Sequence, residues 1–223
     1  MVRNKKFRRV TGIVLGAKEV GEADKLVVLF SPELGKFNVI AYGSNRLKSR
    51  FSNKINMSNV VRCWVRFPQE INKIPSLEET EVLANFFDLV KEEPLKVFSI
   101  NFAVEVINLF VPLEVFDAEL NNLAIKFFED LVTSKNDDET FYVLSKFLVN
   151  FLRVQGILPY VKNEKDLNYS TKLFVISILK NREYTQVDTK TKLDFLDWFS
   201  RKVEKTIAPR KLISIELIRE VLI

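Results

Sequence analysis

Histidine is absent from this 223-residue chain, which also has only one cysteine, Cys63, and six glycines. Without histidine, no imidazole can serve as a catalytic acid or base or as a metal ligand. A lone cysteine excludes an internal disulfide and a zinc site made of cysteines. Neither a G-x-x-x-x-G-K-[ST] phosphate loop nor a G-x-G-x-x-G motif occurs. The sequence therefore predicts a protein that is not an enzyme, with no catalytic residues, no metal and no cofactor.

Long apolar segments are also missing. No uninterrupted apolar run approaches the ~18 residues that a membrane span requires. Met1 is followed by a polar, basic stretch rather than by the apolar core of a secretion signal. We therefore expect a cytoplasmic protein that has no contact with membranes.

The positive charge is concentrated in the first third of the chain. Residues 1–73 hold fifteen lysines or arginines against five acids, whereas the other residues hold nineteen bases against 24 acids. A folded module with a net charge of +10 attracts polyanions, of which nucleic acid is the most common in cells. The excess can also serve solubility alone.

Residues up to about 80 show the pattern of short β-strands. Ser31 to Lys36 form a glycine-containing turn between two runs, which predicts a hairpin. Residues 43–57 are polar and basic without a period, and we expect a loop there. Five strands in this length favour a barrel of the oligonucleotide-binding (OB) type. The expected strands are Phe7–Gly16, Leu26–Phe30, Phe37–Tyr42, Val60–Phe67 and a last one near Ile71–Leu83.

After residue 81 the apolar period becomes helical. Asp137 and Asp138 are expected to cap one helix, which Gly156 would end. We predict an α+β protein with an OB-type nucleic-acid-binding domain at 1–80 and a helical domain at 81–223 for partner binding and support. The expected helices are 94–112, Val115–Val132, 137–153, Thr171–Leu179, Asp188–Thr206 and Leu212–Leu222.

One predicted strand carries an unusual outer face. Apolar residues from Val61 to Phe67 alternate with Arg62, Trp64 and Arg66, so these three share one face. An exposed tryptophan between two cations would offer a stacking platform for bases, worth ~1–3 kcal/mol per base. Alternatively, Trp64 lies under a helix of the second domain, with the arginines extending around it.

Two further basic segments can contact phosphates. The segment 44–51 places a cation at every second position, and it either follows a phosphate backbone or is a mobile, solvated loop. The basic N-terminal cluster can act as a DNA-binding arm or as solubilising charge. The candidate DNA-binding residues are Arg3, Lys5, Lys6, Arg8, Arg9, Lys25, Lys36, Arg46, Lys48, Arg50, Lys54, Arg62, Trp64 and Arg66.

In the helical part, apolar residues stand beside cations near the C-terminus. They can form an aromatic cleft for an acidic peptide tail or belong to the core. They are Leu193, Leu196, Trp198 and Phe199, beside Arg201, Lys202 and Lys205.

Paired acids are the remaining candidates for chemistry. Glu78 with Glu81 and Asp194 with Asp197 could in principle serve a metal-dependent hydrolase. Adjacent acids at these spacings are more typical of a solvated face.

Several motifs resemble the bacterial RecO family of recombination mediators. They are Gly12-Ile13-Val14-Leu15, Gly21-Glu22-Ala23-Asp24-Lys25-Leu26, Phe30 to Lys36, Ala41-Tyr42-Gly43-Ser44 and Lys48-Ser49-Arg50. In the helical half, Phe151 to Pro159 and, more faintly, Pro209 to Leu212 are similar too. Many family members continue with zinc-binding cysteines, where this chain has Val161 to Asp166. This departure indicates either a metal-free branch, with packing in place of the zinc, or a C-terminal half that does not correspond.

The resemblance implies an OB barrel, a helical domain and a role in DNA repair, DNA recombination and the response to DNA damage. Proteins of this kind bind single- and double-stranded DNA, anneal strands, associate with RecR and with the C-terminal tail of SSB, and assist RecA loading. Such a protein would be associated with the nucleoid. A different class of function stays open, namely a non-catalytic adaptor whose basic face binds an acidic protein partner.

Overall fold

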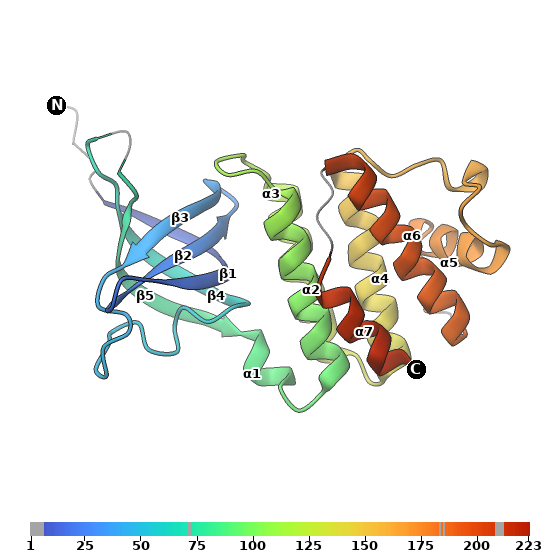
Figure 1. The fold of residues 1–223 in the computed structure, drawn as a ribbon, viewed down its shortest axis with the longest axis horizontal. Helices are drawn as coiled ribbons and strands as arrows, with labels where there is room; N and C mark the ends of the chain where they lie inside the picture. The colour runs from blue at the N-terminus through green and yellow to red at the C-terminus, as the bar shows by residue number, and fades with distance from the viewer. Residues whose placement is uncertain (1–6, 71–72, 183, 185, 208–211) are drawn as a thin grey trace. The chain divides into compact units, whose positions relative to one another are not determined.

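The computed structural model describes residues 7–70, 73–182, 184, 186–207 and 212–223. The chain forms two compact units (Figure 1). The barrel unit comprises Met1–Leu89 and Val111–Asn122, and the helical unit comprises Val90–Phe110 and Leu123–Ile223.

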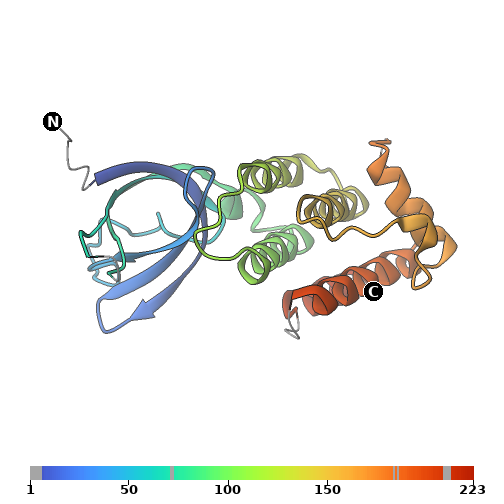
Figure 2. The same cartoon turned by 90° about the horizontal axis from the view of Figure 1, so that it is seen from above.

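Five strands of the barrel unit close into a barrel in the order β1-β2-β3-β5-β4. Neighbouring strands are antiparallel, except that β3 and β5 pair in parallel at Ile40 and Ser76. Figure 2 shows the strands curving around the barrel interior. The predicted α+β class and five-stranded barrel are thereby confirmed. The strands are β1 (Phe7–Val20), β2 (Asp24–Ser31), β3 (Gly35–Ala41), β4 (Asn59–Arg66) and β5 (Ser76–Asn85).

The barrel interior follows the alternation expected from the sequence. On β4, Val61, Cys63 and Val65 are fully buried, while Arg62 and Trp64 lie between them on the other face. Burial raises the pKa of the Cys63 thiol to about 11, with a hydrogen bond to the Thr80 side chain acting in the opposite direction. Cys63 is therefore a core residue, protonated at neutral pH.

A segment from the middle of the chain, residues 111–117, packs against the start of β3. The N–H of Glu114 donates to the carbonyl of Lys36 at 2.7 Å. Gly35, at φ 69°, would place a Cβ only 2.0 Å from the carbonyl oxygen of Val115, so only glycine fits there. Because Leu113 and Glu114 are bonded to Lys36 of this strand, the chain is still extended here, and α3 (Ala118–Thr133) begins three residues later than predicted.

The remaining helices largely follow the predicted ranges. The short helix α1 (Phe86–Val90) was not expected from the apolar pattern. Asn136, rather than Asp137 or Asp138, caps α4 by accepting from the N–H of Glu139, and Gly156 follows its end at φ 69°. The bounds are α2 (Pro94–Phe110), α4 (Asp137–Val154), α5 (Tyr169–Leu179), α6 (Thr189–Ile207) and α7 (Ser214–Leu222).

The proposed aromatic cleft in the helical unit is instead part of its core. Leu196, Trp198 and Phe199 are all completely buried, and Phe199 packs edge-on against Phe102 of α2. The nearby Lys202 pairs with Glu164 at 2.5 Å. An acidic peptide tail therefore has no access to these rings, because helical packing already covers them.

The segment at the position of the family's zinc motif is held by other contacts. Val161 is buried in a short 3-10 turn (Val161–Asn163). Glu164 accepts from the indole N–H of Trp198 at 3.4 Å and pairs with Lys202, while Asp166 lies 3.9 Å from Lys205. Both acids thus have cationic partners, and the segment does not fit a zinc site.

Candidate nucleic-acid interface

The outer face of β1 and β4 places cations beside aromatic rings. Phe7 pairs with Arg66 and Arg9 pairs with Trp64 across the two strands. The guanidinium carbon of Arg66 lies 5.0 Å from the centre of the Phe7 ring, and that of Arg9 lies 5.9 Å from the Trp64 ring. We call Phe7, Arg9, Arg62, Trp64 and Arg66 the outer face of the barrel. Such pairs are worth about 0.5–1 kcal/mol at exposed sites and offer both π-surface and positive charge to a ligand.

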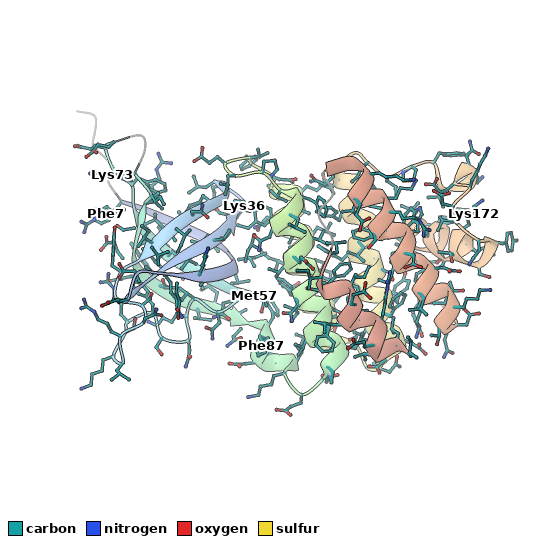
Figure 3. All side chains as sticks on the ribbon, viewed as in Figure 1. Phe7, Lys36, Met57, Lys73, Phe87 and Lys172 are labelled. Carbon is teal, nitrogen blue, oxygen red and sulfur yellow. The ribbon has the colours of Figure 1, made fainter. Side chains whose placement is uncertain are left out.

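Phe7 was missed by the sequence analysis. Its side chain is half exposed, and the residue is labelled at the start of β1 in Figure 3. The period-two rule that groups Arg62 with Trp64 also puts Phe7 and Arg9 on one face of β1. The signal was therefore present in the sequence, but the pairing of β1 with β4 was not known.

Trp64 is half-buried at a small pocket of about 290 Å³. The other lining residues come from the barrel and the preceding loop: Arg50, Lys54, Glu79, Thr80 and Glu81. The pocket thus brings the basic loop and the outer face of β4 together.

The loop at 43–57 is anchored rather than freely solvated. Phe51, only 1% exposed, and Ile55 belong to the barrel core. The side-chain amide of Asn59 donates to the carbonyls of Asn53 and Lys54, both at 3.1 Å. The loop is therefore fixed at its middle and its end, contrary to the mobile alternative.

The start of the loop is tied to the turn between β1 and β2. A carboxylate oxygen of Asp24 accepts from the N–H of Gly43 at 2.7 Å, and the N–H of Asn45 donates to the carbonyl of Ala23. Two of the motifs that resemble the RecO family are thus in direct contact. Their function in this structure is to fix where the basic loop leaves the barrel.

With its ends fixed, the loop exposes its charges. Arg46, Lys48 and Arg50 are exposed and Lys54 is half-buried. Arg50 reaches the outer face through Glu78 on β5, whose carboxylate lies 3.9 Å from Arg50 and 3.0 Å from Arg66. Loop and outer face therefore form one cationic surface.

Carboxylates of β5 neutralise part of that surface. Besides Glu78, Glu81 pairs with Arg62 at 2.8 Å. From the sequence, these two acids were a candidate pair for hydrolysis or, more typically, part of a solvated face. The structure gives each of them an arginine partner, and a site for hydrolysis would have to break both ion pairs.

Three candidate cations lie elsewhere. Lys36 is only 7% exposed, and desolvation lowers the pKa of its ammonium group, so its contact with DNA stays a prediction that this burial disfavours. Lys25 is the second residue of β2 and lies on the face that also carries the buried Val27. Arg8 pairs with Val65 on the opposite face of β1 from Arg9. The candidates Arg3, Lys5 and Lys6 lie outside the described residues.

Neither a metal-binding cluster of side chains nor a membrane-spanning helix occurs in the described part of the chain. Among residues 7–70, 73–182, 184, 186–207 and 212–223, no group of three or more Cys, Asp or Glu side chains is placed to hold a metal ion. Within the same residues, no helix combines the length and the apolar character that crossing a membrane requires.

The barrel unit matches a known family. Residues 6–86, which include all five strands, match the family described as Recombination protein O N terminal. This part of the chain is therefore similar to the N-terminal part of RecO proteins. The resemblance drawn from the motifs is thereby confirmed, and its strongest part coincides with the barrel.

Curated relatives of the RecO family extend the likeness. The DNA repair protein RecO of Oceanobacillus iheyensis is 26% identical over 155 residues, which are 69% of this chain and 57% of that protein. The protein of the same name from Caldanaerobacter subterraneus is 26% identical over 159 residues, or 69% of this chain and 60% of the relative. A Bacillus cereus RecO is 45% identical over 47 residues, 21% of this chain and 19% of the relative. The first two matches thus span less than two thirds of the relatives' own length.

Proposed function

We propose that this protein is a DNA-binding mediator of recombination and repair, which holds DNA on the outer face of its barrel and on the loop at 43–57. One observation carries the proposal. Glu78 contacts both Arg66 of β4 and Arg50 of the loop, so the cation–ring pairs of β1 and β4 and the loop cations lie on one surface. The likeness to the RecO family, in which the relatives described above are named DNA repair proteins, supports the same conclusion.

The chemistry of this surface suits a sugar-phosphate chain with accessible bases. Guanidinium groups bind phosphate oxygens, and the rings of Trp64 and Phe7 can stack on unpaired bases. Double-stranded DNA offers the phosphates but not the base faces. We therefore propose binding of both forms, with the aromatic contribution confined to single strands.

Strand annealing follows from charge neutralisation. When one basic surface screens the phosphates of two complementary strands, their mutual repulsion falls and base pairing proceeds. This work breaks no covalent bond, so we propose a non-enzymatic function. It would be carried out in the cytoplasm at the nucleoid.

The partners RecR, SSB and RecA are proposed on the likeness to the RecO family alone. The aromatic residues of α6 that were first considered for an acidic peptide tail are buried, so a contact with the SSB tail would have to lie elsewhere. Binding of an SSB C-terminal peptide to the full chain, measured by calorimetry, tests this partner.

The salt dependence of DNA binding tests the proposal. For single strands, each phosphate contact contributes about −0.7 to the slope of log K against log salt. Seven cations lie on the outer face and the loop: Arg9, Arg46, Lys48, Arg50, Lys54, Arg62 and Arg66. If four to seven of them contact phosphates, the slope lies between about −3 and −5. A flat line would contradict the proposal.

One observation favours the adaptor as a second candidate. The pairs Arg62–Glu81 and Arg66–Glu78 show that this face accepts carboxylates, as an acidic protein segment would require. A poly-glutamate peptide distinguishes the two functions. Under the DNA-binding proposal it competes weakly with an oligonucleotide, whereas an adaptor binds the peptide and no nucleic acid.

A further inference from the structure

Glu78 binds two candidate phosphate-binding arginines from different parts of the chain. One carboxylate oxygen lies 3.0 Å from Nε of Arg66, and the other lies 3.9 Å from a terminal nitrogen of Arg50. The Ser76 hydroxyl donates to the first oxygen at 2.9 Å. Arg66, Arg50 and the Ser76 hydroxyl thus all contribute to the orientation of the carboxylate.

A β-bulge explains why this carboxylate faces outward. The pairing of β4 with β5 shifts between Trp64 and Val65, which pair with Glu79 and Leu77. Glu78 is therefore the extra residue on β5, and both Glu78 and Glu79 fall between the buried Leu77 and Thr80. An unbulged strand would turn one of these two acids into the barrel.

We propose that Glu78 competes with DNA phosphate for Arg50 and Arg66, and so sets the affinity of the DNA-binding surface. This inference rests on the proposed function. In the free protein the carboxylate stands where a phosphate would bind, and DNA must displace it to engage both arginines fully.

The exposure of the three side chains fits such a competition. The side chains of Arg66 and Arg50 are 53% and 57% exposed, whereas that of Glu78 is only 24% exposed. The arginines therefore present guanidinium N–H groups to solvent, while the less exposed Glu78 carboxylate pairs with their other N–H groups. A phosphate that approaches these groups also meets the negative charge of Glu78, which lowers the affinity further.

A purely structural function of Glu78 predicts the opposite effect. If the carboxylate only fixes the arginines in a productive geometry, its removal leaves two mobile side chains and weakens binding. The sign of the change in affinity therefore separates competition from positioning.

The test uses the full chain with the substitution Glu78→Gln, which keeps the shape of the side chain and an acceptor for Ser76. Binding to a fluorescein-labelled oligo-dT is measured by anisotropy between 50 and 300 mM NaCl. Competition predicts tighter binding by about 2- to 30-fold, the range set by two exposed ion pairs. Equal or weaker binding in a variant that melts like the parent protein overturns the inference.

Glu22→Gln is the matched control. Glu22 lies exposed in the turn between β1 and β2, and its substitution changes the charge of the barrel unit by the same amount. Its dissociation constant should stay at the parent value. A gain equal to that of Glu78→Gln would mean that net charge alone is responsible, and would also overturn the inference.

Two further variants ensure that the conclusion does not depend on Glu78→Gln alone. Glu81→Gln frees Arg62 alone and should give a smaller gain in affinity. In a background that carries Arg66→Gln, the gain from Glu78→Gln should shrink, because one of its two partners is already absent. An undiminished gain in that background contradicts the competition.

Failure of this inference is distinct from failure of the proposed function. If the parent protein binds DNA with a steep salt slope and Glu78→Gln shows no gain, only the competition is wrong. If neither protein binds DNA at any salt concentration, both proposals are wrong.

Discussion

The loop cations offer the sharpest test of the DNA-binding surface. The triple substitution Arg46→Gln, Lys48→Gln and Arg50→Gln removes three exposed charges. The loop should keep its shape, because it is anchored by the buried Phe51 and Ile55. Three lost contacts of about 0.7 each reduce the magnitude of the single-strand slope by about 2.

This change in slope fixes how the ratio of parent to variant affinity changes with salt concentration. Over a fourfold range of salt, one contact changes K by about 2.6-fold, so three contacts change it by about 18-fold. The gap in affinity between parent and variant should therefore be about 18-fold wider at 50 mM than at 200 mM NaCl. Anisotropy titrations with labelled oligo-dT at four salt concentrations measure this directly.

A control triple in the helical unit removes the same charge. Lys162, Lys165 and Lys180 are exposed, and their change to glutamine should leave the slope unaltered. If the loop variant keeps the parent slope, the loop does not contact phosphates. If the control lowers the slope equally, binding depends on net charge and not on this surface.

Three other outcomes are expected. Lys36→Gln should leave the salt slope unchanged because this side chain is buried; a lower slope would return Lys36 to the interface. Phe51→Ala should destabilise the barrel unit by about 3–5 kcal/mol in urea unfolding, since it empties a core position, and a loss below 1 kcal/mol would contradict the anchoring. Lys192 beside Asp138 lowers the pKa of that carboxyl, so the stabilisation is present above the unfolded pKa and is lost as pH falls through the lower folded pKa. Asp138→Asn should accordingly lower the Tm at pH 7 but converge with the parent protein in acid; an equal deficit at both pH values would contradict this.

Local patterns predicted the barrel well. Alternation on β4 identified Val61, Cys63 and Val65 as core, and the same period identified Arg62 and Trp64 as outward-facing. Such patterns follow from the geometry of a single strand, in which successive side chains point to opposite faces. They can therefore be recognised without knowing the rest of the fold. The family resemblance came from the same region of the chain.

Long-range contacts account for what the sequence could not show. Lys36 lies in a motif that looks like a basic hairpin, yet residues 111–117 pack on it from far along the chain. Trp198 stands beside cations in sequence, but helical packing buries it completely. Neither partner is visible in a local window, because burial is decided by which segments meet in the fold.

The ion pairs of the candidate site could not be predicted from the sequence either. Glu78 looks like an ordinary acid on a strand, and only the pairing of β5 with β4 and the position of the loop bring it to Arg66 and Arg50. The charge count correctly found a basic module. It could not show that two β5 acids, Glu78 and Glu81, cover part of it.

The stacking of bases on Trp64 can be observed through tryptophan fluorescence. The chain has two tryptophans, and Trp198 is fully buried in the helical unit, so DNA should quench Trp64 alone. Titration of the parent protein with oligo-dT should quench its emission, and the quenching should disappear in Trp64→Phe, which retains its arginines and still binds. DNA binding without quenching, or quenching that persists in Trp64→Phe, would contradict a binding surface centred on this face of the barrel.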